Sequence, residues 1–125
     1  MPMQAYLAAF EKLKADNAHK TEIRTSVNER HGPAFFVKLG VKYPALTVNA
    51  EIVHIHESDL SGHVMLSIAD AKDIVLKGFG ERHRLSGPLQ GLGYTFLYVP
   101  RSVEEIEVFI RIFQAGIDYM TSAMP

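Results

Sequence analysis

Residues 51–68 read EIVHIHESDLSGHVMLSI, and this stretch decides the fold. Apolar and polar side chains alternate over 51–56 and again over 62–68, and a period of two residues is typical of a β-strand. The connection between the two runs is rich in residues that form turns, namely Ser58, Asp59, Ser61 and Gly62. We therefore predict an antiparallel hairpin.

The alternation also predicts which side chains of the hairpin share a face of the sheet. The first strand places Ile52, His54 and His56 on one face, and the second strand places His63 and Met65 on one face. If the register pairs His56 with His63, the three histidines lie together. A shift by one residue would separate them.

The flanking sequence predicts the remaining elements. We expect helices over 3–16, between a Ser67 cap and a Gly78 stop, and from Ser102 onward, where Asp70 and Glu105 stand three residues after the two serine caps. We expect further strands over 34–39 and 94–99, and irregular segments over 17–32, 40–49 and 79–93. This order predicts an α+β fold, with an antiparallel sheet of about four strands packed against N-terminal, middle and C-terminal helices.

Apolar positions in the three helices predict their buried faces. In the first helix these are Met3, Tyr6, Leu7, Phe10 and Leu13. In the middle helix they are Ile74, Val75 and Leu76, and in the last they are Ile106, Phe109, Phe113, Ile117 and Met120.

Composition bounds the class of protein. A chain of 125 residues with 47% hydrophobic side chains is expected to form one domain over 1–125. The absence of cysteine excludes disulfides, zinc–thiolate sites and cysteine nucleophiles. A net charge of −1 gives no basis for binding nucleic acid. Neither a signal peptide nor an apolar run of about 20 residues is present, so we expect a soluble cytoplasmic protein without a membrane span. Whether the chain forms homo-oligomers stays open.

Four of the six histidines fall within 51–84, which makes this stretch the candidate catalytic region. Imidazole exchanges protons near neutral pH, so the candidate bases are His54, His56, His63 and His83. Asp59 could orient one of these rings or cap its own turn. The H-x-H spacing also occurs in metal sites, with His63 or His83 as a third ligand and Asp59 or Glu57 as a carboxylate. Alternatively, the histidines form hydrogen bonds with each other and with the backbone.

Cationic and aromatic residues after the hairpin are candidates for binding a substrate. Lys77 and Arg82 flank a glycine-rich segment and could hold an anion, or they form part of a solvated rim together with Arg84. Tyr94, Phe96 and Tyr98 alternate along one strand and could line an aromatic pocket or pack in the core.

Several motifs resemble the fungal luciferase domain family. They are EIxHxH over 51–56, followed by Ser58, Asp59, Ser61 and His63, then LSxADAK over 66–72, and KGFGERHxLxG over 77–87, with Phe79 where the family usually has Trp. TFLYxPR over 95–101 and IxYMT over 117–121 also match. The similarity covers about 21–121, after an N-terminal helix within 1–20.

The resemblance implies chemistry of a particular kind. The family's namesake enzymes oxidise 3-hydroxyhispidin, a catechol-bearing α-pyrone, with molecular oxygen and without a metal or an organic cofactor. We therefore expect an oxygenase that needs no cofactor, uses O2 as co-substrate and acts on a small hydroxylated aromatic molecule or pyrone. The histidines would supply the base, Arg82 and Lys77 would hold the substrate anion, and the aromatic residues would stack on its ring.

Two alternatives to this function remain open. One is a non-catalytic module that binds a phenolic or anionic ligand in the same pocket. The other is a metal-dependent enzyme that uses His54, His56 and His63.

Overall fold

A computed structural model describes residues 2–26, 33–40, 42–43, 50–56, 58–83 and 93–122. Its elements are, in chain order, α1 (Pro2–Asp16), β1 (Thr21–Thr25), β2 (Pro33–Val37), β3 (Glu51–Ile55), β4 (Gly62–Met65), α2 (Ile68–Leu76), β5 (Gly80–Arg82), β6 (Tyr94–Leu97) and α3 (Val103–Thr121). The predictions for 44–49, for 84–92 and for Glu57 lie outside the described residues.

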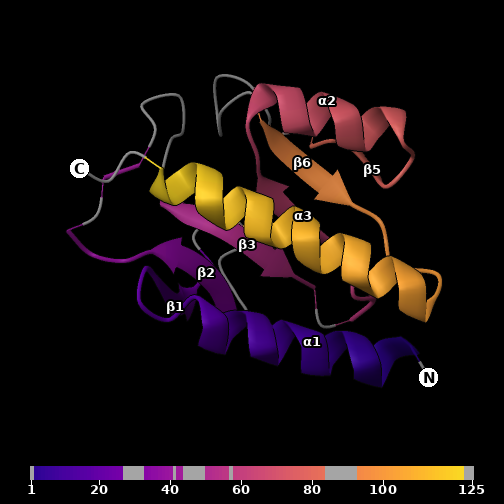
Figure 1. Cartoon of the computed structure of the whole chain (residues 1–125), viewed down its shortest axis with the longest axis horizontal. Helices are drawn as coiled ribbons and strands as arrows, with labels where there is room; N and C mark the ends of the chain where they lie inside the picture. The colour runs from indigo at the N-terminus through magenta and orange to yellow at the C-terminus, as the bar shows by residue number, and fades with distance from the viewer. Residues whose placement is uncertain are drawn as a thin grey trace.

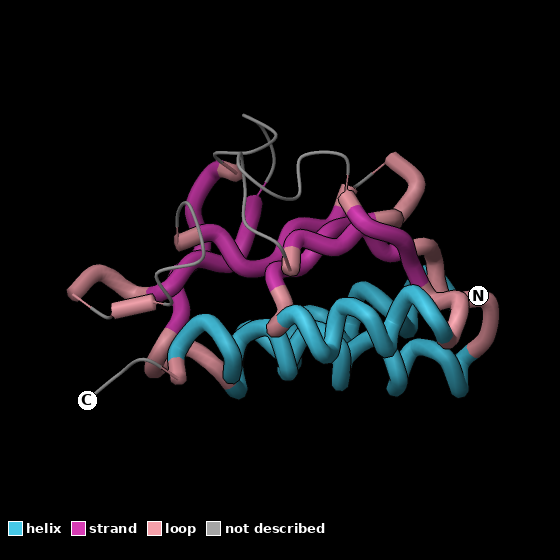
Figure 2. Tube along the Cα trace, turned by 90° about the horizontal axis from the view of Figure 1, so that it is seen from above, coloured by secondary structure: helices cyan, strands magenta, loops and turns pink. Residues whose placement is uncertain are grey.

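The described elements form two layers. All strand pairs are antiparallel, in the order β1-β2-β3-β4-β6-β5 (Figure 1). The three helices lie together on one face of this sheet (Figure 2). The predicted α+β class is confirmed, although the described residues form six strands rather than about four.

The two strands that the sequence did not predict are the edges of the sheet. β1 lies in the segment 17–32, and β5 lies in the segment 79–93, both of which we expected to be irregular. An edge strand has a neighbour on one side only and is often short or polar. In β1 only Thr21 is buried, and β5 has three residues, so neither carries a clear apolar alternation.

The register of the central hairpin keeps the predicted faces. His54 lies opposite His63, whereas the sequence suggested His56 as the partner. The difference is two residues, and side chains in a strand repeat with period two, so His63 still shares a face with the histidines of β3.

A β-bulge changes the prediction for the start of β3. The register with β2 shifts between Phe35, which lies opposite Val53, and Phe36, which lies opposite Glu51. Ile52 is therefore the additional residue. Its side chain lies near α3, on the helix-covered face, and not with His54 as the alternation predicted.

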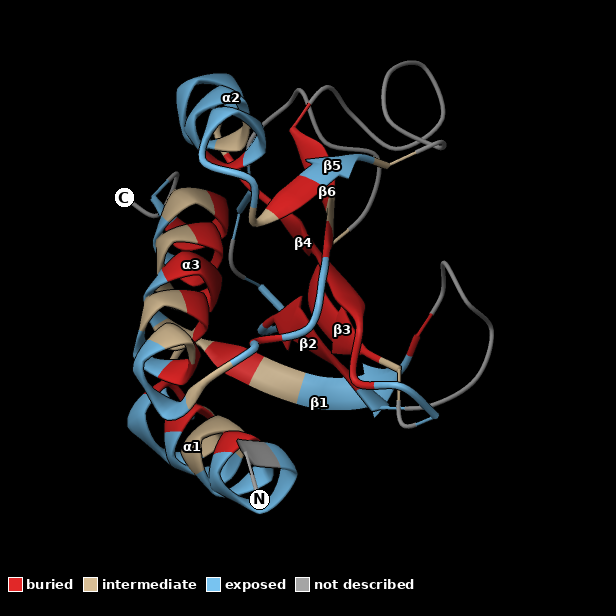
Figure 3. Cartoon of the chain, turned by 90° about the vertical axis from the view of Figure 1, so that its right-hand side faces the viewer, coloured by how far each residue is buried: buried red, intermediate tan, exposed pale blue. Residues whose placement is uncertain are grey.

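The core lies between α3 and the central strands (Figure 3). All five predicted core residues of α3 are buried. In α1, Tyr6 and Leu13 are buried, whereas Met3 and Leu7 are about half exposed. In α2 only Ile74 is buried, since Val75 is 43% and Leu76 86% exposed.

Both predicted serine caps are present. The hydroxyl of Ser67 accepts a hydrogen bond from the backbone N–H of Asp70, and that of Ser102 accepts one from Glu105. Gly78 follows α2 with a φ of 81°, a conformation that favours glycine. Within the described part of the chain, no helix is long and apolar enough to cross a bilayer.

Candidate functional site

Three histidines gather on the face of the sheet opposite α3. His54 in β3 and His63 in β4 lie opposite each other, and His56 follows two residues after His54. Val64, the neighbour of His63, contacts α3, so the histidines point to the other face. His54 and His63 are 1% and 0% exposed, and His56 is half-buried. We call these three residues the histidine triad.

The rings of the triad are close enough to act on one another. Ring centroids are 5.2 Å apart for His54 and His56, 5.2 Å for His54 and His63, and 6.0 Å for His56 and His63. One ring nitrogen from each residue lies within 4.8 Å of the others. The sequence prediction that the three histidines share a face is therefore confirmed.

A backbone carbonyl determines where His54 carries its proton. Nδ1 of His54 is 2.9 Å from the carbonyl oxygen of Pro33, at the start of β2. A carbonyl only accepts, so Nδ1 donates, and in the neutral ring Nε2 keeps its lone pair. This Nε2 is buried and has no hydrogen-bond partner among the described residues. It is the nitrogen that is left to accept a proton or to bind an ion.

Two successive hydrogen bonds determine where His56 carries its proton. The hydroxyl of Ser61 donates to Oδ1 of Asp59 at 2.7 Å. Ser61 has only that one hydroxyl proton, so its Oγ accepts from Nδ1 of His56, 3.0 Å away. Neutral His56 then also keeps its lone pair on Nε2.

Asp59 is linked to His56 by hydrogen bonds through Ser61. The hydroxyl and the backbone N–H of Ser61 both donate to Asp59, and these bonds lower the pKa of Asp59 below its ordinary value. The carboxyl group therefore stays ionised. The sequence pointed to Asp59 as an orienting residue but not to Ser61, although the two-residue spacing of an Asx-turn was a signal for it.

Glu51 is a second carboxylate beside the triad, and the sequence did not single it out. It is 2% exposed, accepts a hydrogen bond of 2.7 Å from Ser26, and its Oε2 lies 3.7 Å from Nε2 of His63. Simple alternation would place Glu51 on the face opposite His54. The β-bulge at Ile52 reverses this and brings Glu51 to the histidine face.

His63 is held in its neutral form. Burial lowers its pKa well below the ordinary 6.5, and the neighbouring rings of His54, His83 and His56 lower it further. An additional charge on this face would lie among buried imidazoles. His63 therefore offers a lone pair rather than a cation.

The fourth predicted histidine joins the triad through an aromatic ring. The ring of Tyr94 in β6 is 4.8 Å from that of His63 and 4.2 Å from that of His83, which follows β5. The rings of His63 and His83 are 5.7 Å apart. The predicted residues His83 and Tyr94 thus lie next to the triad.

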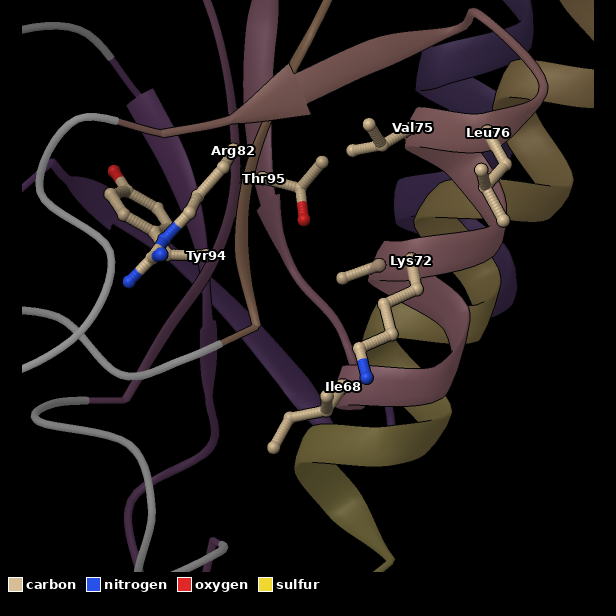
Figure 4. Close-up of a pocket in the computed structure, with 8 residues that line it drawn as sticks. Ile68, Lys72, Val75, Leu76, Arg82, Tyr94 and Thr95 are labelled. Carbon is tan, nitrogen blue, oxygen red and sulfur yellow. The ribbon is translucent and has the colours of Figure 1, made fainter.

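A cavity of about 500 Å³ lies between α2 and the strands β5 and β6 (Figure 4). It is mainly apolar and is bordered by Tyr94 and by two cationic side chains, Lys72 and Arg82. The other residues that line it are Ile68, Ala71, Val75, Leu76 and Thr95. The exposed Val75 and Leu76, which we expected in the core, therefore face this cavity. Lys72 was not predicted, although it stands one helical turn from Ile68 and Val75.

Three other predicted residues do not line this cavity. Lys77 is exposed and forms an ion pair of 2.9 Å with Asp73. Tyr98 lies after the end of β6, is 42% exposed and borders a small cleft near the start of α3. Phe96 lies opposite His63 in the register and is half-buried, with its ring 6.1 Å from that of Tyr98.

Comparisons with known proteins agree with the motifs in this region. A family model described as the luciferase domain matches residues 49–116. A luciferase of Neonothopanus nambi is 34% identical over 130 residues, which cover 89% of this chain and 47% of that protein. Luciferases of Armillaria ostoyae and Armillaria gallica are each 43% identical over 76 residues, which cover 58% of this chain and 29% of those proteins.

The chain spans about half, or less, of the length of these curated relatives. No solved structure gives a significant match. The matched region 49–116 contains the histidine triad, His83 and all the residues that line the cavity. On this similarity, the chain belongs to the luciferase domain family.

Proposed function

We propose that this chain is a luciferase-like oxygenase that oxidises a hydroxylated aromatic molecule or pyrone, such as 3-hydroxyhispidin, with O2. One observation carries the proposal. Tyr94 is one of the residues that line an apolar cavity, and its ring contacts the rings of His63 and His83. Tyr94 therefore connects the cavity to the imidazole rings.

The cavity has the properties that such a substrate needs. Its volume of about 500 Å³ falls within the roughly 300–1,000 Å³ of small-molecule sites. The apolar side chains of α2 would cover the substrate ring. Lys72 and Arg82 would attract the negative oxygen that forms when a phenolic or enolic hydroxyl loses its proton. This assigns to Lys72 the role that the sequence suggested for Lys77.

The chemistry would start at His83. Its ring is half-buried and lies against Tyr94, whereas the rings of His54 and His63 are fully buried and less accessible to a substrate. His83 would take the hydroxyl proton, and the resulting anion would donate two electrons from a ring carbon to O2. A carbon–oxygen bond forms, and the proton returns to the bound peroxide. The substrate supplies the electrons, so the reaction needs no organic cofactor.

The test is to mix the purified chain with 3-hydroxyhispidin in air and to follow oxygen uptake and photon emission. We expect uptake above the background of a His83→Ala variant, which lacks the proposed base. Lys72→Ala should raise KM about 10-fold, because a hydrogen bond to a charged group is worth roughly 1.5 kcal/mol and the variant cannot donate one to the bound anion. Lys77→Ala removes an equal charge outside the cavity and should leave KM unchanged.

The opposite outcomes are equally clear. Binding of the phenolic substrate without oxygen uptake would replace this proposal with the non-catalytic binding module. Equal effects of Lys72→Ala and Lys77→Ala would place the substrate outside the cavity.

A further inference from the structure

We propose that the histidine triad, His54, His56 and His63, binds a divalent first-row transition-metal ion. The first argument is the convergence of three nitrogen atoms. They lie within 4.8 Å of one another, on a sheet face where two of the three rings are fully buried. Imidazole nitrogen is a preferred ligand of Zn²⁺, Cu²⁺, Fe²⁺ and Ni²⁺, whereas Mg²⁺ and Ca²⁺ prefer oxygen.

The second argument is the state of the ring protons. His54 donates from Nδ1 to the carbonyl of Pro33, and His56 donates from Nδ1 to Ser61, which is bonded to Asp59. Histidines that bind metal nearly always donate their other ring N–H to a carbonyl or carboxylate in this way. Such bonds fix the tautomer that leaves Nε2 with a lone pair for the ion.

The third argument is a buried acceptor that needs a partner. Nε2 of His54 has no hydrogen-bond partner among the described residues. An unsatisfied buried polar atom costs about 1–3 kcal/mol. A cation between the rings would satisfy this lone pair.

The dimensions of the triad suit such an ion after a small adjustment. Zn–N bonds of 2.0–2.1 Å in a tetrahedral site place ligand nitrogens about 3.3 Å apart. The nitrogens lie within 4.8 Å, so the rings must approach by up to about 1.5 Å. Three protein ligands would leave one position open for water or substrate, as in catalytic zinc sites.

A carboxylate behind the third ligand supports the same assignment. Oε2 of Glu51 lies 3.7 Å from Nε2 of His63 and accepts a hydrogen bond from Ser26. Its negative charge would offset part of the charge of the ion. A slight approach would also let it accept a hydrogen bond from His63, which would leave Nδ1 of His63 for the metal.

This site does not depend on the proposed oxygenase function. That chemistry was assigned to His83, and the family resemblance implies an enzyme without a metal. Ion binding by an inactive chain would support the site and contradict the oxygenase. Full turnover in EDTA, with no ion bound by the triad, would support the oxygenase and contradict the metal site.

The experiment uses the full chain without a histidine tag, treated with EDTA and dialysed. Co²⁺ is titrated while the visible spectrum is recorded, and Zn²⁺ is then added as a competitor. We expect one Co²⁺ per chain, d–d absorption bands of a four- or five-coordinate site, and loss of these bands with one equivalent of Zn²⁺. Elemental analysis of untreated protein should show a transition metal.

Three variants locate the ion. His56→Ala changes the half-buried ligand and should abolish the bands. Ser61→Ala leaves all three ligands in place but removes the acceptor of the hydrogen bond from Nδ1 of His56. It should weaken Co²⁺ binding about 10–100-fold. His19→Ala removes an exposed histidine outside the triad and should bind as the wild type. Circular dichroism shows whether each variant is folded.

A folded wild type that binds neither Co²⁺ nor Zn²⁺ at millimolar concentration would overturn the proposal. Wild-type affinity in both His56→Ala and Ser61→Ala would overturn it as well. If His56→Ala does not fold, the result for Ser61→Ala decides, because that change leaves the triad intact.

Discussion

Acid should destabilise this fold through His63. The ring is fully buried, and burial, followed by the rings of His54, His83 and His56, lowers its pKa well below the ordinary value. In the unfolded chain the same ring titrates near pH 6.5. As the pH falls through 6.5, the unfolded state gains a proton that the folded state does not accept. The free energy of unfolding therefore decreases below pH 6.5 and is unaffected by this group above it.

The size of the effect follows from linkage. One group that is protonated only in the unfolded state changes the free energy of unfolding by up to about 1.4 kcal/mol per pH unit. Two units below pH 6.5 would therefore remove up to about 2.7 kcal/mol. A domain has about 5–15 kcal/mol in total, so this loss is large. The free energy of unfolding stops decreasing through this group once the pH falls below the pKa of His63 in the folded state.

The assay is urea denaturation between pH 7.5 and 4.5, in EDTA so that no bound ion contributes. The quantity of interest is the difference in free energy of unfolding between wild type and His63→Gln. Below pH 6.5 this difference should shift in favour of the variant by up to about 1.4 kcal/mol per unit. The same difference is measured for His63→Leu, whose side chain has no hydrogen-bond donor or acceptor. His19→Gln controls for the loss of one histidine.

Parallel pH profiles for wild type and both His63 variants would refute this reasoning, because they would mean that His63 takes up its proton equally in the two states. A profile that diverges for His19→Gln as much as for His63→Gln would place the effect outside the buried site.

Four further substitutions test how the fold positions the site, each by urea denaturation. Gly116→Val should destabilise by about 1–3 kcal/mol, because a Cβ atom there would lie 2.5 Å from Cγ2 of Val64. Ser67→Ala should cost about 1 kcal/mol through loss of the cap of α2, and an unchanged midpoint would show that the cap contributes nothing. Ile74→Ala should cost about 2 kcal/mol or more, whereas Leu76→Ala, at an exposed position, should change stability by less than about 0.5 kcal/mol.

Strong apolar periodicity explains which parts of the fold could be predicted. The stripe of α3 reflects burial, so the sequence carries it directly. β1 and β5 are edge strands with little burial, and no apolar pattern marks them. In α2, Val75 and Leu76 border a cavity instead of the core. An apolar residue beside a cavity and one in a core look the same in a sequence.

The candidate site was predictable where it depends only on which face of the sheet alternate residues of a strand occupy. His54 and His63 share a face because a two-residue error in register does not change the side on which a residue lies. Glu51 reaches the same face only through the bulge at Ile52, and a bulge has no sequence signal here. Ser61 depends on the shape of the turn after β3, which places its hydroxyl between Asp59 and His56.

The polarity of the histidine face argues for a function in its own right. Apolar residues at His54 and His63 would fill the same buried space without leaving polar atoms to satisfy. The fold instead keeps buried imidazoles and fixes the protons of two of them, on His54 through Pro33 and on His56 through Ser61. A structural network needs donors and acceptors to match, yet Nε2 of His54 stays without a hydrogen-bond partner among the described residues. A site built to receive a ligand atom needs such a lone pair. Because His83 lies 5.7 Å from His63 by ring centroids, a base and an ion could reach the same small substrate.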